Sequence, residues 1–109
     1  MHELSVTQSV VDAVIDRMGE AEVTSVLLEI GKLSGIEPDS VKFCFEIVAS
    51  GTTLENASLE IVELPGQGRC RACHEVLTID DRILLCTCGS ADVEVLGGAE
   101  LRIRSVEVA

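Results

Sequence analysis

Residues 70–88 read CRACHEVLTIDDRILLCTC, a stretch that contains two close pairs of cysteines. The first pair lies in Cys70-Arg71-Ala72-Cys73, and the second lies in Cys86-Thr87-Cys88, after twelve intervening residues. Two such pairs can bring four thiolates into a tetrahedron around Zn²⁺. A segment this small cannot bury enough apolar surface to fold unaided, so we expect the metal ion to be part of its fold.

The second pair has one residue between its cysteines, where the usual turn has two. This shorter spacing leaves His74 as a reserve fourth ligand if Cys86 points away from the metal. Gly89 permits the backbone conformation that such a turn often needs. Two disulfides, or an iron–thiolate redox site, are alternative uses of the same cysteines. A chain without a signal-peptide pattern, however, more often uses close-spaced cysteines to hold metal.

Helical and strand-like patterns occupy the rest of the chain. Apolar residues at three- and four-residue spacing predict helices over residues 3–18 and about 37–49. Alternating patterns predict strands over 23–33, over 58–64 and from residue 100 onwards. The apolar stripes of the two helices comprise Leu4, Val11, Val14, Ile15 and Met18 in the first, and Val41, Cys44, Phe45 and Val48 in the second. On this interpretation Cys44 is a buried structural thiol, because free cysteine packs as a small hydrophobe.

Two glycine-rich stretches, Pro65-Gly66-Gln67-Gly68 and Gly97-Gly98, are interpreted as linkers. The strand after the second linker needs a sheet to join, and the strands over 23–33 and 58–64 provide one. The sequence therefore predicts an α+β fold, with a small three-stranded sheet and two helices. Residues 1–65, completed by 99–109, would form this domain, and 66–98 an inserted zinc-ribbon-like domain.

Composition and charge narrow the function. The chain has 109 residues with two Phe and no Tyr or Trp, so its core must be aliphatic. Its net charge of −11 repels phosphate backbones, which argues against a nucleic-acid partner. No apolar run approaches the length of a membrane span. We therefore expect a cytoplasmic protein without a membrane or nucleic-acid partner.

The first three residues, Met1-His2-Glu3, form a second candidate metal site. The α-amine of Met1, the backbone nitrogen between residues 1 and 2, and the His2 imidazole can all face one metal ion. The fused rings that they close favour a square-planar ion such as Ni(II) or Cu(II). The helix predicted from residue 3 places His2 at an exposed helix end, where it is free to bind.

Several stretches together resemble the HypA/HybF family of nickel chaperones. They are Met1-His2-Glu3-Leu4-Ser5, Ile30-Gly31-Lys32-Leu33-Ser34-Gly35-Ile36-Glu37-Pro38, the two cysteine pairs with Gly89-Ser90, and Glu100-Leu101-Arg102-Ile103. They occur in the family's order along essentially the whole chain. The family helps to insert nickel into [NiFe]-hydrogenase and, in some organisms, into urease.

The resemblance implies a nickel-binding α/β domain formed by both ends of the chain and a zinc domain between them. It implies nickel ligation by Met1, His2 and Glu3, through the terminal amine, the backbone nitrogens and the His2 side chain. Glu37 would lie near this site, although a carboxylate at a helix start also has a capping role. The implied zinc ligands are the four paired cysteines, Cys70, Cys73, Cys86 and Cys88.

The implied partners are the GTPase HypB and the precursor of the hydrogenase large subunit. The chain has no phosphate-binding loop and no histidine-centred catalytic dyad, so we expect a chaperone that is not an enzyme. A zinc-ribbon interaction module with an accidental Met-His start is the alternative, together with the iron–thiolate protein.

Overall fold

The computed structural model describes residues 2–81 and 83–109. Two helices and six strands follow one another along the chain: α1 (Glu3–Met18), β1 (Val23–Gly31), α2 (Pro38–Val48), β2 (Ser58–Leu64), β3 (Gly66–Cys70), β4 (Val76–Ile79), β5 (Val93–Gly97) and β6 (Leu101–Val108). The predicted α+β fold is confirmed. Neither helix in the described part of the chain is long and apolar enough to cross a membrane.

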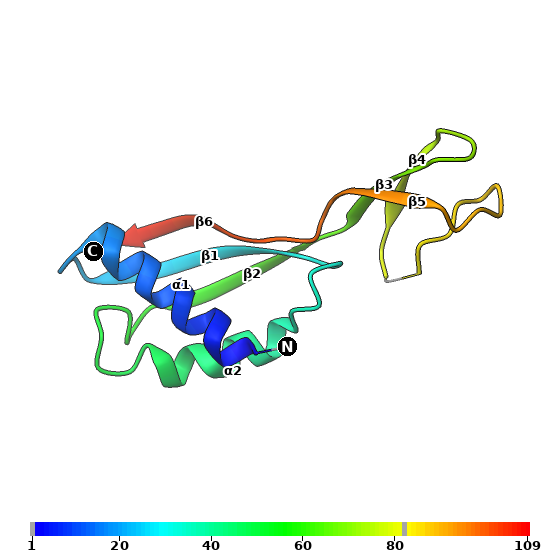
Figure 1. Ribbon diagram of the computed structural model, residues 1–109. Helices are drawn as coiled ribbons and strands as arrows, with labels where there is room; N and C mark the ends of the chain where they lie inside the picture. Colours follow the sequence, from blue (N-terminus) through cyan, green and yellow to red (C-terminus); the bar gives the residue numbers. More distant parts are fainter. Residues whose placement is uncertain (1, 82) are drawn as a thin grey trace.

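The larger sheet has the strand order β2-β1-β6. Central strand β1 runs parallel to β2 and antiparallel to β6, so that Leu28 lies between Ile61 and Ile103. Parallel neighbours need a crossover connection, and α2 lies in the one between β1 and β2. Both helices pack on the same face of this sheet (Figure 1). The terminal strand therefore joins the two strands that the sequence analysis assigned to it.

An aliphatic core fills the space between the sheet and the helices. Alternate residues of β1 point into it, as expected for a strand with one face buried. Its buried members are Val10, Val11, Val14, Val23, Val26, Leu28, Ile30, Val41, Phe45, Ala49 and Leu54. Phe45 is the only aromatic residue among them, so the core is aliphatic as predicted.

Two residues of the predicted helix stripes lie outside this core. Leu4 is 55% exposed, because the buried face of α1 begins only at Thr7. Cys44 is half-buried and is not part of the core cluster, because Val41 and Phe45 occupy the core-facing side of α2. The prediction of a buried structural thiol at Cys44 is therefore wrong.

On the opposite face of the sheet, one buried carboxylate ties β6 to β1. The side chain of Glu29 is 6% exposed and accepts a hydrogen bond from Arg104 at 2.6 Å. It also pairs with Arg102 at 3.2 Å. Two cations compensate the cost of desolvating this carboxylate, so the pairing favours the observed register of the terminal strand.

A second sheet, with the order β4-β3-β5, projects from one end of the molecule (Figure 1). Its central strand β3 starts at Gly66, so the prediction of a linker over residues 65–68 is wrong. Gly66 pairs with Ile79 and Gly68 pairs with Leu77 across to β4, and Gly68 also pairs with Val95 of β5. The glycine-rich stretch has a low propensity for strand structure, and it forms a strand because it pairs with a neighbour on each side.

The two sheets meet where three backbone segments cross. The N–H of Leu33 donates to the carbonyl of Gly98, and the N–H of Lys32 donates to that of Leu64. A Cβ atom on Gly31 would overlap the carbonyl group of Gly98, and one on Gly98 would overlap the backbone of Gly66. Glycine at these positions is therefore a steric requirement of the junction.

This junction predicts the effect of one added methyl group. Gly31→Ala should lower the free energy of unfolding by roughly 1–3 kcal/mol or more, the usual cost of forcing an atom into a filled site. Gly97→Ala is the matched control, since its Cβ meets no atom within 4 Å, and should change stability by at most about 1 kcal/mol. Urea denaturation of both variants measures the difference. Equal midpoints would show that the backbone crossing does not constrain the fold.

Candidate metal centres

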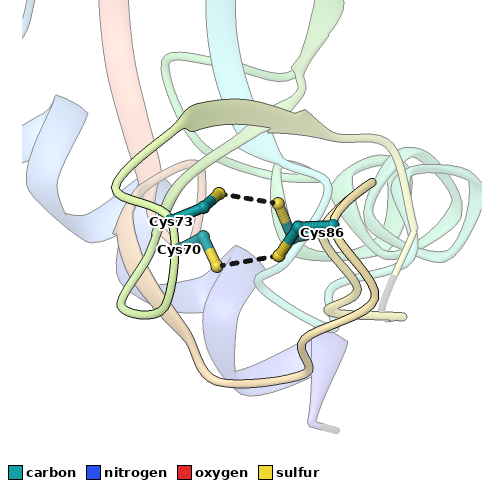
Figure 2. A group of neighbouring side chains, drawn as sticks. Cys70, Cys73 and Cys86 are labelled. Atoms are coloured by element: carbon teal, nitrogen blue, oxygen red, sulfur yellow. Dashed lines mark hydrogen bonds between the residues drawn. The ribbon is translucent and has the colours of Figure 1, made fainter.

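Four cysteine sulfurs converge at the end of the second sheet. The Sγ atoms of Cys70 and Cys88 are 3.7 Å apart, and those of Cys73 and Cys86 are 3.6 Å apart. All four lie within 4.8 Å of one another (Figure 2). Each close approach joins one cysteine of the first pair to one of the second, so the cluster closes the hairpin region between them.

These separations fit a metal site. Zinc–sulfur bonds of about 2.3 Å in a tetrahedron place the sulfur atoms about 3.8 Å apart. A disulfide would require a separation of about 2.05 Å, and all five cysteines of the chain are free. The observed arrangement is therefore compatible with a structural metal such as zinc.

The first cysteine turn begins where β3 ends. The N–H of Cys70 donates to the carbonyl of Glu75, and the N–H of His74 donates to the carbonyl of Cys70. His74 has a φ of 67°, which makes it the one non-glycine residue with positive φ in the described part of the chain. Histidine tolerates this left-handed conformation better than most residues. His74 thus holds the left-handed backbone position of the first cysteine turn.

The second turn repeats this pattern with one residue fewer. The N–H of Cys86 donates to the carbonyl of Ser90, and that of Gly89 donates to the carbonyl of Cys86. Gly89, with a φ of 97°, takes the left-handed position that His74 takes in the first turn. Each hydrogen-bonded ring is one residue shorter than its counterpart, and this compensates for the shorter cysteine spacing. Cys86 is buried and contributes its sulfur to the cluster.

His74 itself is not a member of the metal-competent group. Among the described residues, the group at this position contains the four cysteine sulfurs alone. The turn is tied instead through Arg71, whose guanidinium pairs with Asp92 at 2.9 Å and whose N–H donates to the Asp92 carbonyl. These two contacts join the first cysteine turn to the segment just before β5.

The four clustered thiols change one another's ionisation. The N–H of Cys73 lowers the pKa of the Cys70 thiol to about 6, although burial opposes this shift. The N–H of Glu75 lowers the pKa of Cys73, but the hydrogen bond with Cys86, burial and the other thiols outweigh it and raise that pKa to about 12. One thiolate thus opposes ionisation of its neighbour, so binding a metal has to displace protons from the cluster.

The second candidate site lies at the start of α1. His2 is exposed and occupies the N-cap position, and its carbonyl accepts the hydrogen bond from the N–H of Val6. The first backbone N–H groups of a helix have no acceptor within the helix. The amide nitrogens of His2 and Glu3 are therefore not required by α1. The predicted ligand Met1 lies outside the described residues.

Glu3 and Glu37 meet at this end of the molecule. The carboxylate of Glu3 accepts a hydrogen bond from the N–H of Glu37 at 3.2 Å, and this bond is the main reason that the pKa of Glu3 is lowered. The side chain of Glu37 instead caps α2, because it accepts the N–H of Asp39 at 3.4 Å. Glu37 thus lies beside the candidate nickel ligands, with its backbone turned to Glu3 and its carboxylate used as a helix cap.

Residues from both helix starts lie beside His2 and Glu3, and the sequence did not assign them to a site. An open hollow of about 630 Å³ lies between the two helix starts. It is lined by His2, Glu3, Leu4, Ser5, Asp39, Ser40, Phe43 and Cys44. One signal for it was available: Phe43 falls outside the apolar stripe of its helix, so a large side chain was left without a place in the core.

Known proteins match this chain over nearly its whole length. Residues 1–108 match the family described as "HypA: Hydrogenase/urease nickel incorporation, metallochaperone, hypA". The hydrogenase maturation factor HypA of Nostoc punctiforme is 47% identical over 108 residues, covering 99% of this chain and 96% of that protein. The protein of the same name from Geotalea uraniireducens is 44% identical over 109 residues, covering 99% of each chain.

Solved structures agree with these sequence matches. The solution structure of the Ni metallochaperone HypA from Helicobacter pylori superposes with a TM-score of 0.70 at 25% identity, covering 99% of this chain and 97% of that one. The family match spans both candidate metal centres and both sheets. This chain therefore belongs to the HypA family of hydrogenase and urease nickel-incorporation metallochaperones.

Proposed function

We propose that the chain binds Ni(II) through Met1, His2 and Glu3 and delivers it during maturation of [NiFe]-hydrogenase. The observation that carries the proposal is the start of α1 at Glu3, directly after an exposed His2. The terminal amine, the His2 and Glu3 amide nitrogens and the imidazole can then act as ligands without breaking a helix hydrogen bond. Nitrogen donors in a plane suit Ni(II).

The position of this site suits transfer of a metal ion. A ligand set at an exposed chain end can be approached by an incoming ligand of another protein, which exchange requires. The proposed partners are the GTPase HypB and the precursor of the hydrogenase large subunit, and the proposed compartment is the cytoplasm. Urease is a second proposed client, because the description of the family names both enzymes.

For the second centre, we propose one structural Zn²⁺ held by Cys70, Cys73, Cys86 and Cys88. The sulfur separations of 3.6 and 3.7 Å support this ligand set. Among the described residues, the buried cluster around these sulfurs consists of Cys70, Ile79, Cys86 and Val93, and two of these are proposed ligands. A core of this size needs a metal to be stable, which supports treating residues 66–98 as a metal-dependent domain.

The nickel chelate predicts an unusual sensitivity to the chain terminus. One glycine added before Met1 keeps every side chain, but it converts the terminal amine to an amide and moves His2 out of register. Nickel affinity should fall by more than the roughly 100-fold that outer hydrogen-bond partners contribute to metal sites. His2→Ala, which removes the imidazole, should have the same effect.

Isothermal titration with Ni(II), on protein with its native terminus, measures this loss. A glycine added after Ala109 is the matched control and should leave nickel affinity unchanged. Circular dichroism checks that α1 persists in all variants. An amino-terminally extended chain that binds nickel as tightly as the native one would rule out the proposed ligands.

The zinc ligand set predicts a contrast between His74 and Cys86. His74→Gly removes the imidazole and places glycine at a left-handed position, so zinc affinity should be unchanged. Stability should stay level or rise by about 1 kcal/mol, the cost of this conformation for an L residue. Cys86→Ser should release zinc. Competition with a chromophoric chelator measures both affinities, and zinc loss in His74→Gly would make the imidazole a ligand.

Removal of the metal should unfold one part of the chain first. Elemental analysis is expected to find about one zinc per chain, whereas iron would indicate the thiolate redox alternative. After chelation, amide protection should be lost in β3, β4 and β5 and retained in β1. Hydrogen exchange resolves the two sheets, and uniform protection before and after chelation would contradict a structural role for the metal.

A further inference from the structure

Three large apolar side chains are exposed on the helices beside the candidate nickel site. Phe43 is 66% exposed, Ile47 is 57% exposed and Leu4 is 55% exposed. Phe43 and Ile47 are one turn apart on α2, so they lie on the same side of this helix. Leu4 of α1 lines the same hollow as Phe43. We refer to Leu4, Phe43 and Ile47 as the helix-pair ridge.

The ridge is not a by-product of core packing. The core face of α2 is already provided by the buried residues Val41 and Phe45. Single exposed apolar residues are common on protein surfaces and need no explanation. Grouped ones rimmed by polar residues are typical of interaction sites, and here one of only two phenylalanines in the chain is among them.

Two members of the ridge line the same hollow as the proposed nickel ligands, and Ile47 lies one turn further along α2. His2 and Glu3 line the hollow together with Leu4 and Phe43. α1 and α2 begin side by side at this end of the molecule (Figure 1). A protein that covered the ridge would therefore bring its own side chains to the ligands, which is the geometry that metal transfer requires.

The charges around the ridge select the kind of partner. Asp39 lies one turn before Phe43, and Glu46 lies one turn after it, both exposed. Glu3 lines the hollow and accepts a hydrogen bond from the N–H of Glu37, and Lys42 is the basic residue of α2. A second copy of this chain, with its own charge of −11, would bring the same carboxylates against these. A partner with a basic rim would be attracted instead.

We propose that the helix-pair ridge is the docking surface for the protein that accepts the nickel ion. Its partner presents an apolar centre bordered by Lys or Arg side chains. This proposal rests on the proposed function, because it assigns the docking surface of the same site. The apolar contacts provide affinity, and the acidic border orients the partner so that its ligands face His2.

The test is to make the ridge polar without touching the nickel ligands. The variant Phe43→Gln/Ile47→Gln changes two exposed side chains. Its matched control, Val62→Gln/Val108→Gln, changes two exposed residues of the large sheet, which are 44% and 45% exposed. The probe is the purified hydrogenase large-subunit precursor from the same genome, which is the proposed nickel acceptor, titrated with the nickel-loaded full chain.

The ridge variant should bind the precursor about tenfold or more weakly, as expected when central apolar anchors are truncated. The control should bind as the unaltered chain does. Asp39→Lys/Glu46→Lys should also weaken binding and reduce its dependence on salt. Circular dichroism and hydrogen exchange of α2 verify that each variant is folded.

Other outcomes overturn the proposal. They are an unchanged affinity of the ridge variant for the precursor, or no binding of the precursor to the unaltered chain. A dimer that the ridge substitutions convert to a monomer would make a second copy the occupant. Nickel titration of the ridge variant distinguishes failure of the docking proposal from failure of the proposed function. If nickel binding is unchanged, the proposed function stands whatever the docking result. If the unaltered chain does not bind nickel, the proposed function fails, and the ridge can then be a docking surface for the precursor but not for nickel transfer.

Discussion

The crossing of three backbone segments at Gly31, Gly66 and Gly98 is the constraint on which the arrangement of this molecule depends. β1 leaves the large sheet there, β3 begins the small sheet, and the chain returns from β5 to β6. Side chains at these positions would hold the segments apart and break the hydrogen bonds between them. The chain enters the small sheet and returns from it through this crossing. The crossing therefore determines where the cysteine-containing segment lies relative to the helices.

The loop between β1 and α2 contacts both candidate metal centres. At the cysteine cluster, Leu33 reaches from the loop after β1 and packs against the small buried core, and Lys32 pairs with Asp80 at 3.4 Å. At the amino-terminal centre, the contact between Glu3 and the Glu37 amide joins the starts of the two helices. The same loop, residues 32–37, thus begins at one centre and ends at the other.

Local patterns in the sequence were sufficient for most elements. Helix α1 has the predicted bounds, and the predicted strand over 58–64 is β2. The four cysteines could be grouped from spacing alone, because two short turns leave few other ways to satisfy four thiols. The terminal strand could be assigned to the sheet because two other predicted strands were available to receive it. The amino-terminal chelate could be proposed because its donors are adjacent in the chain.

Long-range contacts decided the remainder. Gly66–Cys70 is a strand only because β4 and β5 pair with it. Its glycines have low strand propensity, so the sequence pattern predicted a linker there. Spacing left Cys86 and His74 as alternatives, whereas the matching hydrogen bonds of the two turns bring the Cys86 sulfur into the cluster. The sequence by itself determined which residues can bind metal and which faces are apolar, since both depend on near neighbours. Only the tertiary structure decided that Leu4, Phe43 and Cys44 line a hollow beside His2, because that depends on how two helices distant in sequence pack on one sheet.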